Sequence, residues 1–301
     1  MNKKQRDKEK QLVLEMSKDI ESLSNSDKKE LLRLRCRTEF ATFAKFITRE
    51  IGINGTFKPY EVHSLICNYV QGICDGDPKY RRTVISLPPR TGKSLLISKL
   101  MPTWQLGRSP TSQFILASYA LKLSQEASRS ILAYTTSEAF HWVFPECEVL
   151  EKNSNLKTIR SEQGGLIMAA SAGGGVTGFG YGVISEDDLP GIGILDDLLE
   201  DGNSAQVLES TFSWTATQFL TRGLPNNCVA SVGTRFHKED VSGRLITSDP
   251  DLWLQLNVPA LCTDEDTDPL GRKLNESHWP EFFPTSALES IKKQDPKTFE
   301  V

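Results

Sequence analysis

A short apolar stretch that runs directly into Gly-Lys-Ser constrains this chain more than any other feature of its sequence. Residues 83–87 (TVISL) are typical of a strand buried on both faces, and residues 95–100 (LLISKL) are typical of a helix. The residues between them, 88–94 (PPRTGKS), therefore predict a loop that opens a helix, where backbone N–H groups point outward. Such a loop, with a lysine charge and a hydroxyl for Mg²⁺, suits the phosphates of a nucleotide.

The loop departs from the common phosphate-binding pattern G-x-x-x-x-G-K-[ST] at its first position, which is Leu87 instead of glycine. A Gly-Lys-Ser tripeptide also occurs by chance in loops, but its place between a strand and a helix favours phosphate binding. The two prolines would hold the loop extended, and its arginine would add a second cation. We predict nucleotide contacts from seven residues, the last of which would also bind Mg²⁺: Pro88, Pro89, Arg90, Thr91, Gly92, Lys93 and Ser94.

A second apolar stretch ends in acidic residues, as a nucleotide site with Mg²⁺ requires. Residues 191–197 (GIGILDD) predict a buried strand, after which Asp196 would face the metal and Asp197 would activate the attacking water. ATPases of this division commonly carry Glu at the second place, and Asp is shorter by roughly 1.5 Å. Glu200 and Asp201 therefore stay open as alternatives for the water-activating role.

Two less specific interpretations apply to these acids. An acidic loop that closes an apolar strand is a common surface pattern, and residues 183–188 (VISEDD) also run from apolar to acidic. That second stretch is too short for a buried strand and is followed by Pro190, so we expect a turn there. Because a candidate phosphate loop is present in the same chain, the metal role of Asp196 is favoured.

Between and after these motifs the chain alternates short apolar runs with polar stretches of helical length. This alternation predicts an α/β fold with a mostly parallel central sheet and helices on both faces. We expect an N-terminal helical extension over residues 1–50, the sheet domain over 51–248, and a linker over 249–301, where six prolines interrupt the chain. The other strands are expected at 113–118, 166–170 and 229–232, and crossover helices at 94–106, 120–139 and 203–222.

Composition narrows the classes of function. A net charge of −4 and a pI near 5.7 exclude a globally basic DNA-coating protein, so any nucleic-acid contact must be local or shared among subunits. The six cysteines form no C-x-x-C pair, which argues against a metal site or a disulfide framework. No apolar run reaches the roughly 18 to 20 residues of a membrane helix, and we expect a cytoplasmic protein with no membrane contact.

Further short motifs follow in a definite order along the chain. They are Ser118-Tyr119, Ser128-Arg129, Phe144-Pro145, 174–178 (GGVTG), Trp214, 221–225 (TRGLP), 233–237 (GTRFH) and 243–245 (GRL). Together with the Pro-Pro-x-x-Gly-Lys-Ser loop that lacks its first glycine, this series resembles the large terminase subunits of tailed bacteriophages, over about residues 57–290. The resemblance implies a P-loop NTPase fold of the RecA-like, additional-strand division.

The resemblance also implies a coupling role at the end of the strand expected at 229–232. Thr234 or its backbone would sense the γ-phosphate, and with Arg235 it would pass that state to the parts that grip DNA. The alternative for Arg235 is a structural ion pair with Glu239 or Asp240.

Several cationic and aromatic residues acquire roles by the same resemblance. Family motors work as rings in which an arginine of one subunit completes the site of the next, and Arg129 and Arg222 are the candidates, with Arg90 acting in its own subunit. Tyr60 and His63 correspond to the segment that contacts adenine. A surface arginine, a core aromatic and a helix-surface histidine are the alternative interpretations.

The implied activity is hydrolysis of ATP with Mg²⁺ to drive double-stranded DNA into a viral procapsid. The implied partners are the portal protein, the small terminase subunit and further copies of this chain in a ring on the portal, within the bacterial host cytoplasm; the isolated chain could be monomeric. The family usually continues into a nuclease domain, but no strand-borne carboxylate cluster follows residue 250, so we expect the ATPase part alone without nuclease activity. The alternatives are a helicase-like remodelling ATPase and a nucleotide-binding module with weak catalysis.

Overall fold

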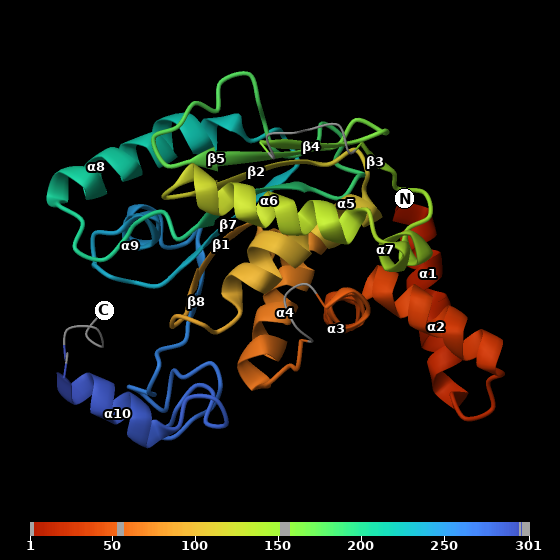
Figure 1. The fold of residues 1–301 in the computed structure, drawn as a ribbon, viewed down its shortest axis with the longest axis horizontal. Coiled ribbons are helices and arrows are strands. Elements are labelled where there is room, and N and C mark those ends of the chain that lie inside the picture. The colour runs from red at the N-terminus through yellow and green to blue at the C-terminus, as the bar shows by residue number, and fades with distance from the viewer. Residues whose placement is uncertain (1–2, 53–56, 151–156, 295, 297–301) are drawn as a thin grey trace.

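An eight-stranded sheet lies at the centre of the computed structural model, which describes residues 3–52, 57–150, 157–294 and 296 (Figure 1). The strand order is β3-β4-β5-β2-β6-β7-β1-β8. The six strands from β5 to β8 in this order pair in parallel, whereas β3 and β4 add an antiparallel edge. The strands are β1 (Arg82–Ser86), β2 (Gln113–Ser118), β3 (Val149–Leu150), β4 (Thr158–Ser161), β5 (Leu166–Ser171), β6 (Gly191–Asp196), β7 (Asn227–Gly233) and β8 (Leu254–Asn257).

Helices cover both faces of the sheet, as the sequence predicted. No helix in the described ranges is both long and apolar enough to cross a lipid bilayer. The α-helices are α1 (Lys3–Met16), α2 (Asn25–Thr38), α3 (Phe40–Ile51), α4 (Glu61–Asp75), α5 (Met101–Arg108), α6 (Leu121–Thr135), α7 (Glu138–Val143), α8 (Ala205–Trp214), α9 (Val241–Ser248) and α10 (Thr285–Gln294). Shorter turns are the 3₁₀ helices η1 (Ser17–Asp19), η2 (Pro78–Tyr80) and η5 (Leu220–Arg222), and the π-helical η3 (Ser94–Leu100) and η4 (Thr215–Phe219).

Neighbouring residues of each central strand point to opposite faces, and both are buried. Ile85 and Ile194 join a core with α3 to α7, while Val84 and Leu195 join a second core with α8, η4 and α9. Burial on both faces explains why these strands read as continuous apolar runs in the sequence. All six cysteines are free and buried, so they serve as small core residues in this fold.

The sheet extends past the boundary expected at residue 248. β8 pairs in parallel with β1, so the residues after 248 first complete the sheet before they leave it. Leu256 of β8 and Trp253, just before it, are buried in the cores on opposite faces of the sheet, whereas Gln255 and Asn257 are exposed. The strand has four residues and a single buried position, and this pattern is too short to predict a strand from the sequence.

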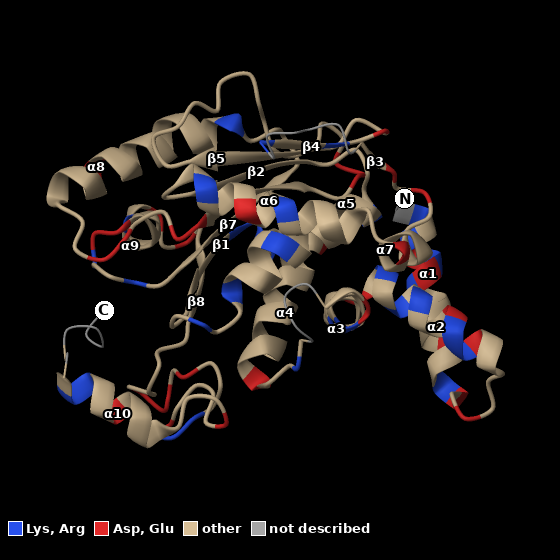
Figure 2. Ribbon diagram, in the orientation of Figure 1, with Lys and Arg blue, Asp and Glu red and all other residues tan. Residues whose placement is uncertain are grey.

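The N-terminal extension is a helical hairpin of α1 and α2 that projects from the sheet domain (Figure 1). Acidic and basic residues alternate along it, as Figure 2 shows. From Lys3 onward its first helix is held in place, because Glu9 pairs with the buried guanidinium of Arg37 at 3.1 Å and Val13 packs against α2. The Glu9–Arg37 pair thus joins the two helices of the hairpin, and Cys36 of α2 is buried in the core of the sheet domain.

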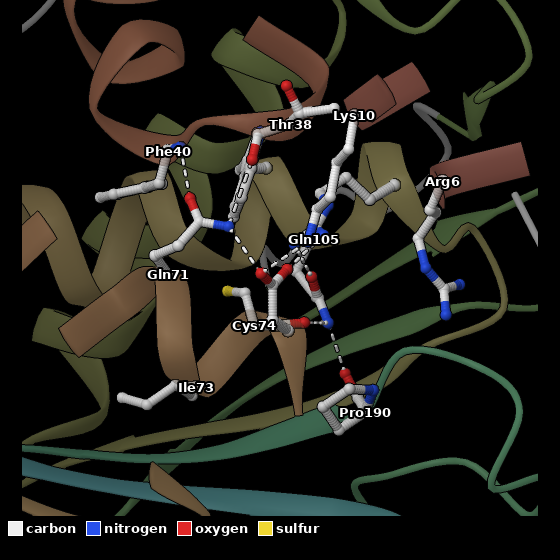
Figure 3. Close-up of polar contacts among 12 residues, drawn as sticks. Arg6, Lys10, Thr38, Phe40, Gln71, Ile73, Cys74, Gln105 and Pro190 are labelled. Carbon is white, nitrogen blue, oxygen red and sulfur yellow. Dashed lines mark hydrogen bonds and ion pairs between the residues drawn. The ribbon is translucent and has the colours of Figure 1, made fainter. Parts of the chain in front are cut away.

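A polar network ties this hairpin to the amino-terminal edge of the sheet (Figure 3). The Gln105 side chain donates hydrogen bonds to the carbonyls of Cys74 (3.0 Å) and Pro190 (2.8 Å), joining α5 to α4 and to the start of β6. Asp75 at the end of α4 forms an ion pair with Lys10 of α1 at 3.2 Å. These contacts lie at the edge opposite to the loops that follow β1 and β6.

Candidate functional site

The carboxyl ends of β1, β2, β6 and β7 meet at one edge of the sheet because these strands are parallel. Backbone hydrogen bonds continue the pairing beyond the strand ends. The Leu87 N–H donates to the Gly233 carbonyl (3.1 Å), the Asp197 N–H to Val232 (2.9 Å), and the Tyr119 N–H to Asp197 (3.2 Å). The loops that follow these four strands are therefore brought together where ligands bind in open α/β sheets.

The 88–94 loop follows β1 and opens η3. The Thr91 hydroxyl donates a 2.6 Å hydrogen bond to the carbonyl of the first loop residue, which closes the loop on itself. Arg90 and Gly92 have positive φ angles of 63° and 75°, and the first is strained because it is not a glycine. The N–H groups of Thr91, Gly92 and Lys93 have no acceptor among the described residues. These donors at a helix start are suited to an anion.

Lys93 reaches from this loop toward the end of β7 and the acids after β6. Its Nζ donates to the Thr234 hydroxyl at 2.7 Å and lies 3.8 Å from Asp197 Oδ2. Only 6% of Lys93 is exposed, and burial lowers its pKa, although Asp197 and Asp196 oppose that effect. A buried ammonium with nearby carboxylates is available to a polyanionic ligand.

Asp196 ends β6 with a buried carboxylate. Its Oδ2 accepts a 2.6 Å hydrogen bond from Ser98, and its Oδ1 accepts one of 3.3 Å from Ser94. Burial, and next the charge of Asp197, raises the pKa of Asp196 to about 6. The Ser94 hydroxyl and the Asp196 carboxylate are adjacent hard oxygen donors, so the pair fits Mg²⁺.

Asp197 continues from the strand with an unusual backbone. Its φ is 44°, which is strained for a residue other than glycine and turns the side chain toward the cavity. Oδ1 accepts the Thr234 N–H at 3.0 Å, while Oδ2 faces Lys93. A side chain at Gly233 would come within 3.0 Å of Oδ1, so the glycine leaves room for this carboxylate.

A cavity of about 510 Å³ lies between these groups. At its mouth the Tyr119 hydroxyl hydrogen bonds with Glu200, which raises the pKa of Tyr119. A smaller cavity of about 260 Å³ shares part of this wall, including Asp197 and Thr234. The larger cavity is lined by Pro89, Arg90, Gly92, Lys93, Ser94, Leu95, Tyr119, Asp197, Leu199, Glu200, Asp201, Thr234 and Phe236.

The structure thus brings together most of the predicted nucleotide residues, but not all of them. Pro88 and the buried Thr91 are absent from the cavity lining, and Asp196 lies beneath it. Within the described ranges, no group of three or more His, Cys, Asp or Glu side chains would hold a metal ion. A metal at Ser94 and Asp196 would therefore need further oxygen ligands from water or from phosphate.

Of the two residues expected near adenine, Tyr60 and His63, only His63 contacts the loop. His63 is only 3% exposed, accepts the Tyr60 N–H at Nδ1 (2.9 Å) and hydrogen bonds with the Thr91 backbone. Burial lowers the pKa of His63 to about 4. Tyr60 lines a separate groove with Pro269 and Leu270. His63 is thus a support beneath the loop, not a helix-surface residue.

The two arginines predicted to act on a neighbouring subunit lie outside the cavity. Arg129 on α6 is exposed and pairs with Glu126 at 2.5 Å. The Arg222 carbonyl accepts the Tyr181 N–H (3.1 Å) before β7 begins, so this residue lies at the opposite edge of the sheet. Neither arginine reaches the site of its own chain.

The residues after β7 divide into two roles. Thr234 contacts both Lys93 and Asp197, which places it within the site. Arg235 instead pairs with Asp240 at 2.7 Å and so braces the turn before α9. The structural alternative for Arg235 is the one observed, with Asp240 as the partner.

The competing acidic stretch at residues 183–188 lies away from the site. Val183 bridges Asn226, which precedes β7, and the Asp188 carbonyl accepts a 2.8 Å hydrogen bond from the Asn226 side chain. These contacts belong to the amino-terminal edge of the sheet, as expected for a turn rather than a metal site.

Sequence reasoning missed three residues of the site. Ser98 lies one helical turn after Ser94 on η3, so its spacing was a usable signal. Tyr119 is the first residue after a predicted strand, where ligand contacts gather. Phe236 lies within the 233–237 motif but was given no role there, because only the fold of the turn after β7 brings it to the cavity.

Comparisons with known proteins do not identify the family of this chain. Neither a scan against protein-family models nor a search of curated proteins found a match. The likeness to terminases therefore remains a proposal that depends on residues and geometry.

The elevated pKa of Asp196 makes a testable contribution to stability. Because its folded pKa of about 6 exceeds the ordinary aspartate value of 3.8, the folded state binds more protons between these pH values. The wild type therefore loses stability, relative to Asp196→Asn, as pH rises through this window, and the difference levels off above about pH 7. Urea unfolding of both proteins from pH 4.5 to 7.5 without divalent ions measures this difference in the free energy of unfolding. Parallel pH profiles would contradict the burial of this charge.

Proposed function

We propose that this chain binds ATP with Mg²⁺ at the 88–94 loop and hydrolyses it to ADP and phosphate. One observation carries the proposal. Lys93, which follows β1, and Asp197, which follows β6, meet at 3.8 Å across one cavity although about a hundred residues separate them in the chain. A loop with unpaired N–H donors, a buried ammonium and an adjacent acid pair is what phosphoryl transfer requires.

The residues of the site divide the work of binding. The N–H groups of the loop and Lys93 Nζ would hold the β- and γ-phosphate oxygens. Ser94 and Asp196 would hold Mg²⁺, which when bound supplies positive charge for the same oxygens. Arg90, at the cavity wall, adds a cation within the same subunit.

Asp197 is the residue best placed to activate water. Its Oδ1 is held by the Thr234 N–H, which leaves Oδ2 toward the cavity. This carboxylate would accept a proton as the water oxygen bonds to the γ-phosphorus and the bond to the bridging oxygen breaks, releasing ADP. Thr234 contacts both Asp197 and Lys93, so it would respond to the loss of the γ-phosphate.

The strand order supports a P-loop NTPase fold of the RecA-like, additional-strand division. β7 lies between β1, which leads into the loop, and β6, which carries the acids. The motif series resembling terminases then favours a DNA-packaging motor. We propose double-stranded DNA, the portal protein, the small terminase subunit and other copies of this chain as its partners. Because Arg129 and Arg222 lie outside their own site, they remain the candidates for action on a neighbouring copy.

Removal of the lysine charge tests the nucleotide site directly. We expect Lys93→Ala to abolish ATP hydrolysis and to weaken nucleotide binding, because the buried cation is lost. Lys79→Ala is the matched control, since Lys79 is exposed before β1 at the other end of the strand. Phosphate release and titration of a fluorescent ATP analogue provide the measurements. Undiminished turnover in Lys93→Ala would defeat the assignment.

Three further variants decide which acid activates water. We expect Asp197→Asn to lower kcat by about 10² to 10⁴ while ATP binding is retained. Glu200→Gln and Asp201→Asn should stay within a few fold of wild type, because Asp197 alone is fixed beside Lys93. Single-turnover hydrolysis with saturating ATP separates the rate of the hydrolysis step from the affinity for ATP. A large loss in Glu200→Gln alone would transfer the role to Glu200.

The motor assignment predicts a response to DNA. We expect double-stranded DNA, together with a portal ring, to raise the hydrolysis rate of the full chain without separating the strands of a forked duplex. Steady-state phosphate release and a gel assay of the fork measure the two effects. Strand separation would favour the helicase-like alternative, and binding of ATP without turnover under all conditions would favour a non-catalytic module.

A further inference from the structure

The residues after β8 form an ordered unit next to the 88–94 loop. We call residues 258–283 the C-terminal segment. It begins where the Val258 N–H donates to the Ser86 carbonyl (3.0 Å), at the very end of β1. Arg272 and Asp268 form an almost fully buried ion pair at 2.6 Å within it. A buried pair with several hydrogen bonds holds the segment in a definite shape rather than as a loose linker.

Trp279 connects this segment to α4. The backbone N–H of Trp279 donates to the Ser277 hydroxyl (3.1 Å), and this hydroxyl donates to the Phe283 carbonyl (2.6 Å). The backbone around the indole ring is therefore fixed. The indole meets the His63 ring edge-on, with centroids 4.6 Å apart. Phe57 meets the same imidazole edge-on at 5.5 Å. His63 is therefore held by aromatic rings that include one from the C-terminal segment.

His63 in turn contacts the 88–94 loop. Its Nδ1 accepts the Tyr60 N–H, so the proton of the neutral ring lies on Nε2, and the ring also hydrogen bonds with the Thr91 backbone. A side chain at Gly92 would come within 3.6 Å of Cδ2 and Nε2 of His63. The imidazole thus supports Thr91 and Gly92, two of the three loop residues whose N–H groups would face the phosphates.

We propose that His63 is a positioning residue for the 88–94 loop, and that Trp279 makes its position depend on the conformation of the C-terminal segment. The inference rests on the proposed nucleotide site. It adds a route of regulation: a movement of the C-terminal segment changes nucleotide affinity, and bound nucleotide stabilises the segment to the same extent. Residues 258–283 are then part of the motor site rather than a passive connection.

Substitutions at His63 and Trp279 can break the contacts that link the C-terminal segment to the 88–94 loop. His63→Asn keeps an acceptor for the Tyr60 N–H but loses the hydrogen bond with the Thr91 backbone. Trp279→Ala removes the ring from His63, whereas Trp279→Phe retains an aromatic edge there. Leu274→Ala is the matched control, because Leu274 belongs to the same segment and is 55% exposed.

The experiment measures affinity for a fluorescent ATP analogue with Mg²⁺ in the full chain, with thermal unfolding in parallel. We expect His63→Asn and Trp279→Ala each to weaken binding about tenfold, from the loss of about one hydrogen bond or its support. The double variant should be little worse than either single one, because both changes break one chain of contacts. Trp279→Phe and Leu274→Ala should bind as wild type does. Bound nucleotide should also slow amide hydrogen exchange in residues 258–283.

The outcomes separate this inference from the proposed function. If wild type and all variants bind the analogue equally, the positioning role is refuted while the nucleotide site stands. Additive losses in the double variant would likewise refute it, because the two residues would act independently. If wild type itself does not bind the analogue, the proposed function is what fails. Should Trp279→Ala not fold, the comparison of His63→Asn with wild type and the hydrogen exchange still decide.

Discussion

The buried carboxylate at the end of β6 is the constraint on which the rest of the site depends. A charge cannot be placed under a sheet edge without partners, and Asp196 finds them in the hydroxyls of Ser94 and Ser98 on η3. These bonds attach η3, the helix that follows β1 and the 88–94 loop, to β6. In the sheet β6 is not next to β1, because β7 lies between them. The loop, its lysine and the acid pair are consequently held in one arrangement.

Two of the three described non-glycine residues with a positive φ lie around the same point; the third, Asn275, lies in the C-terminal segment. Arg90 and Asp197 both adopt positive φ angles, and both line the larger cavity. Such conformations cost free energy and persist only where the surrounding structure enforces them. Here the parallel register of β1, β7 and β6 does so through the bonds of Leu87, Asp197 and Thr234 at the strand ends. The proposed chemistry assigns a direct role to both Arg90 and Asp197.

The fold also shows why some predictions from sequence succeeded and others did not. β2 was placed at its observed bounds, because burial on both faces leaves an unbroken apolar run. β8 was missed, because an edge strand of four residues leaves almost no pattern. The alternative of a helix-surface position for His63 was wrong, because its burial comes from Phe57, Trp279 and the loop, which lie far apart in the chain. Likewise only the fold selects Asp240 as the partner of Arg235.

The sequence by itself determined the local elements of this protein: the strand, loop and helix around Gly92-Lys93-Ser94, and the apolar strand that ends in Asp196 and Asp197. Those features depend on neighbouring residues and on periodicity, which a sequence displays directly. The tertiary structure alone decided which groups meet. It paired Lys93 with Asp197 and Thr234, kept Arg129 and Arg222 away from the cavity, and placed Trp279 against His63. The physical reason is that strand order and register set distances between residues remote in the chain, and no local pattern carries that information.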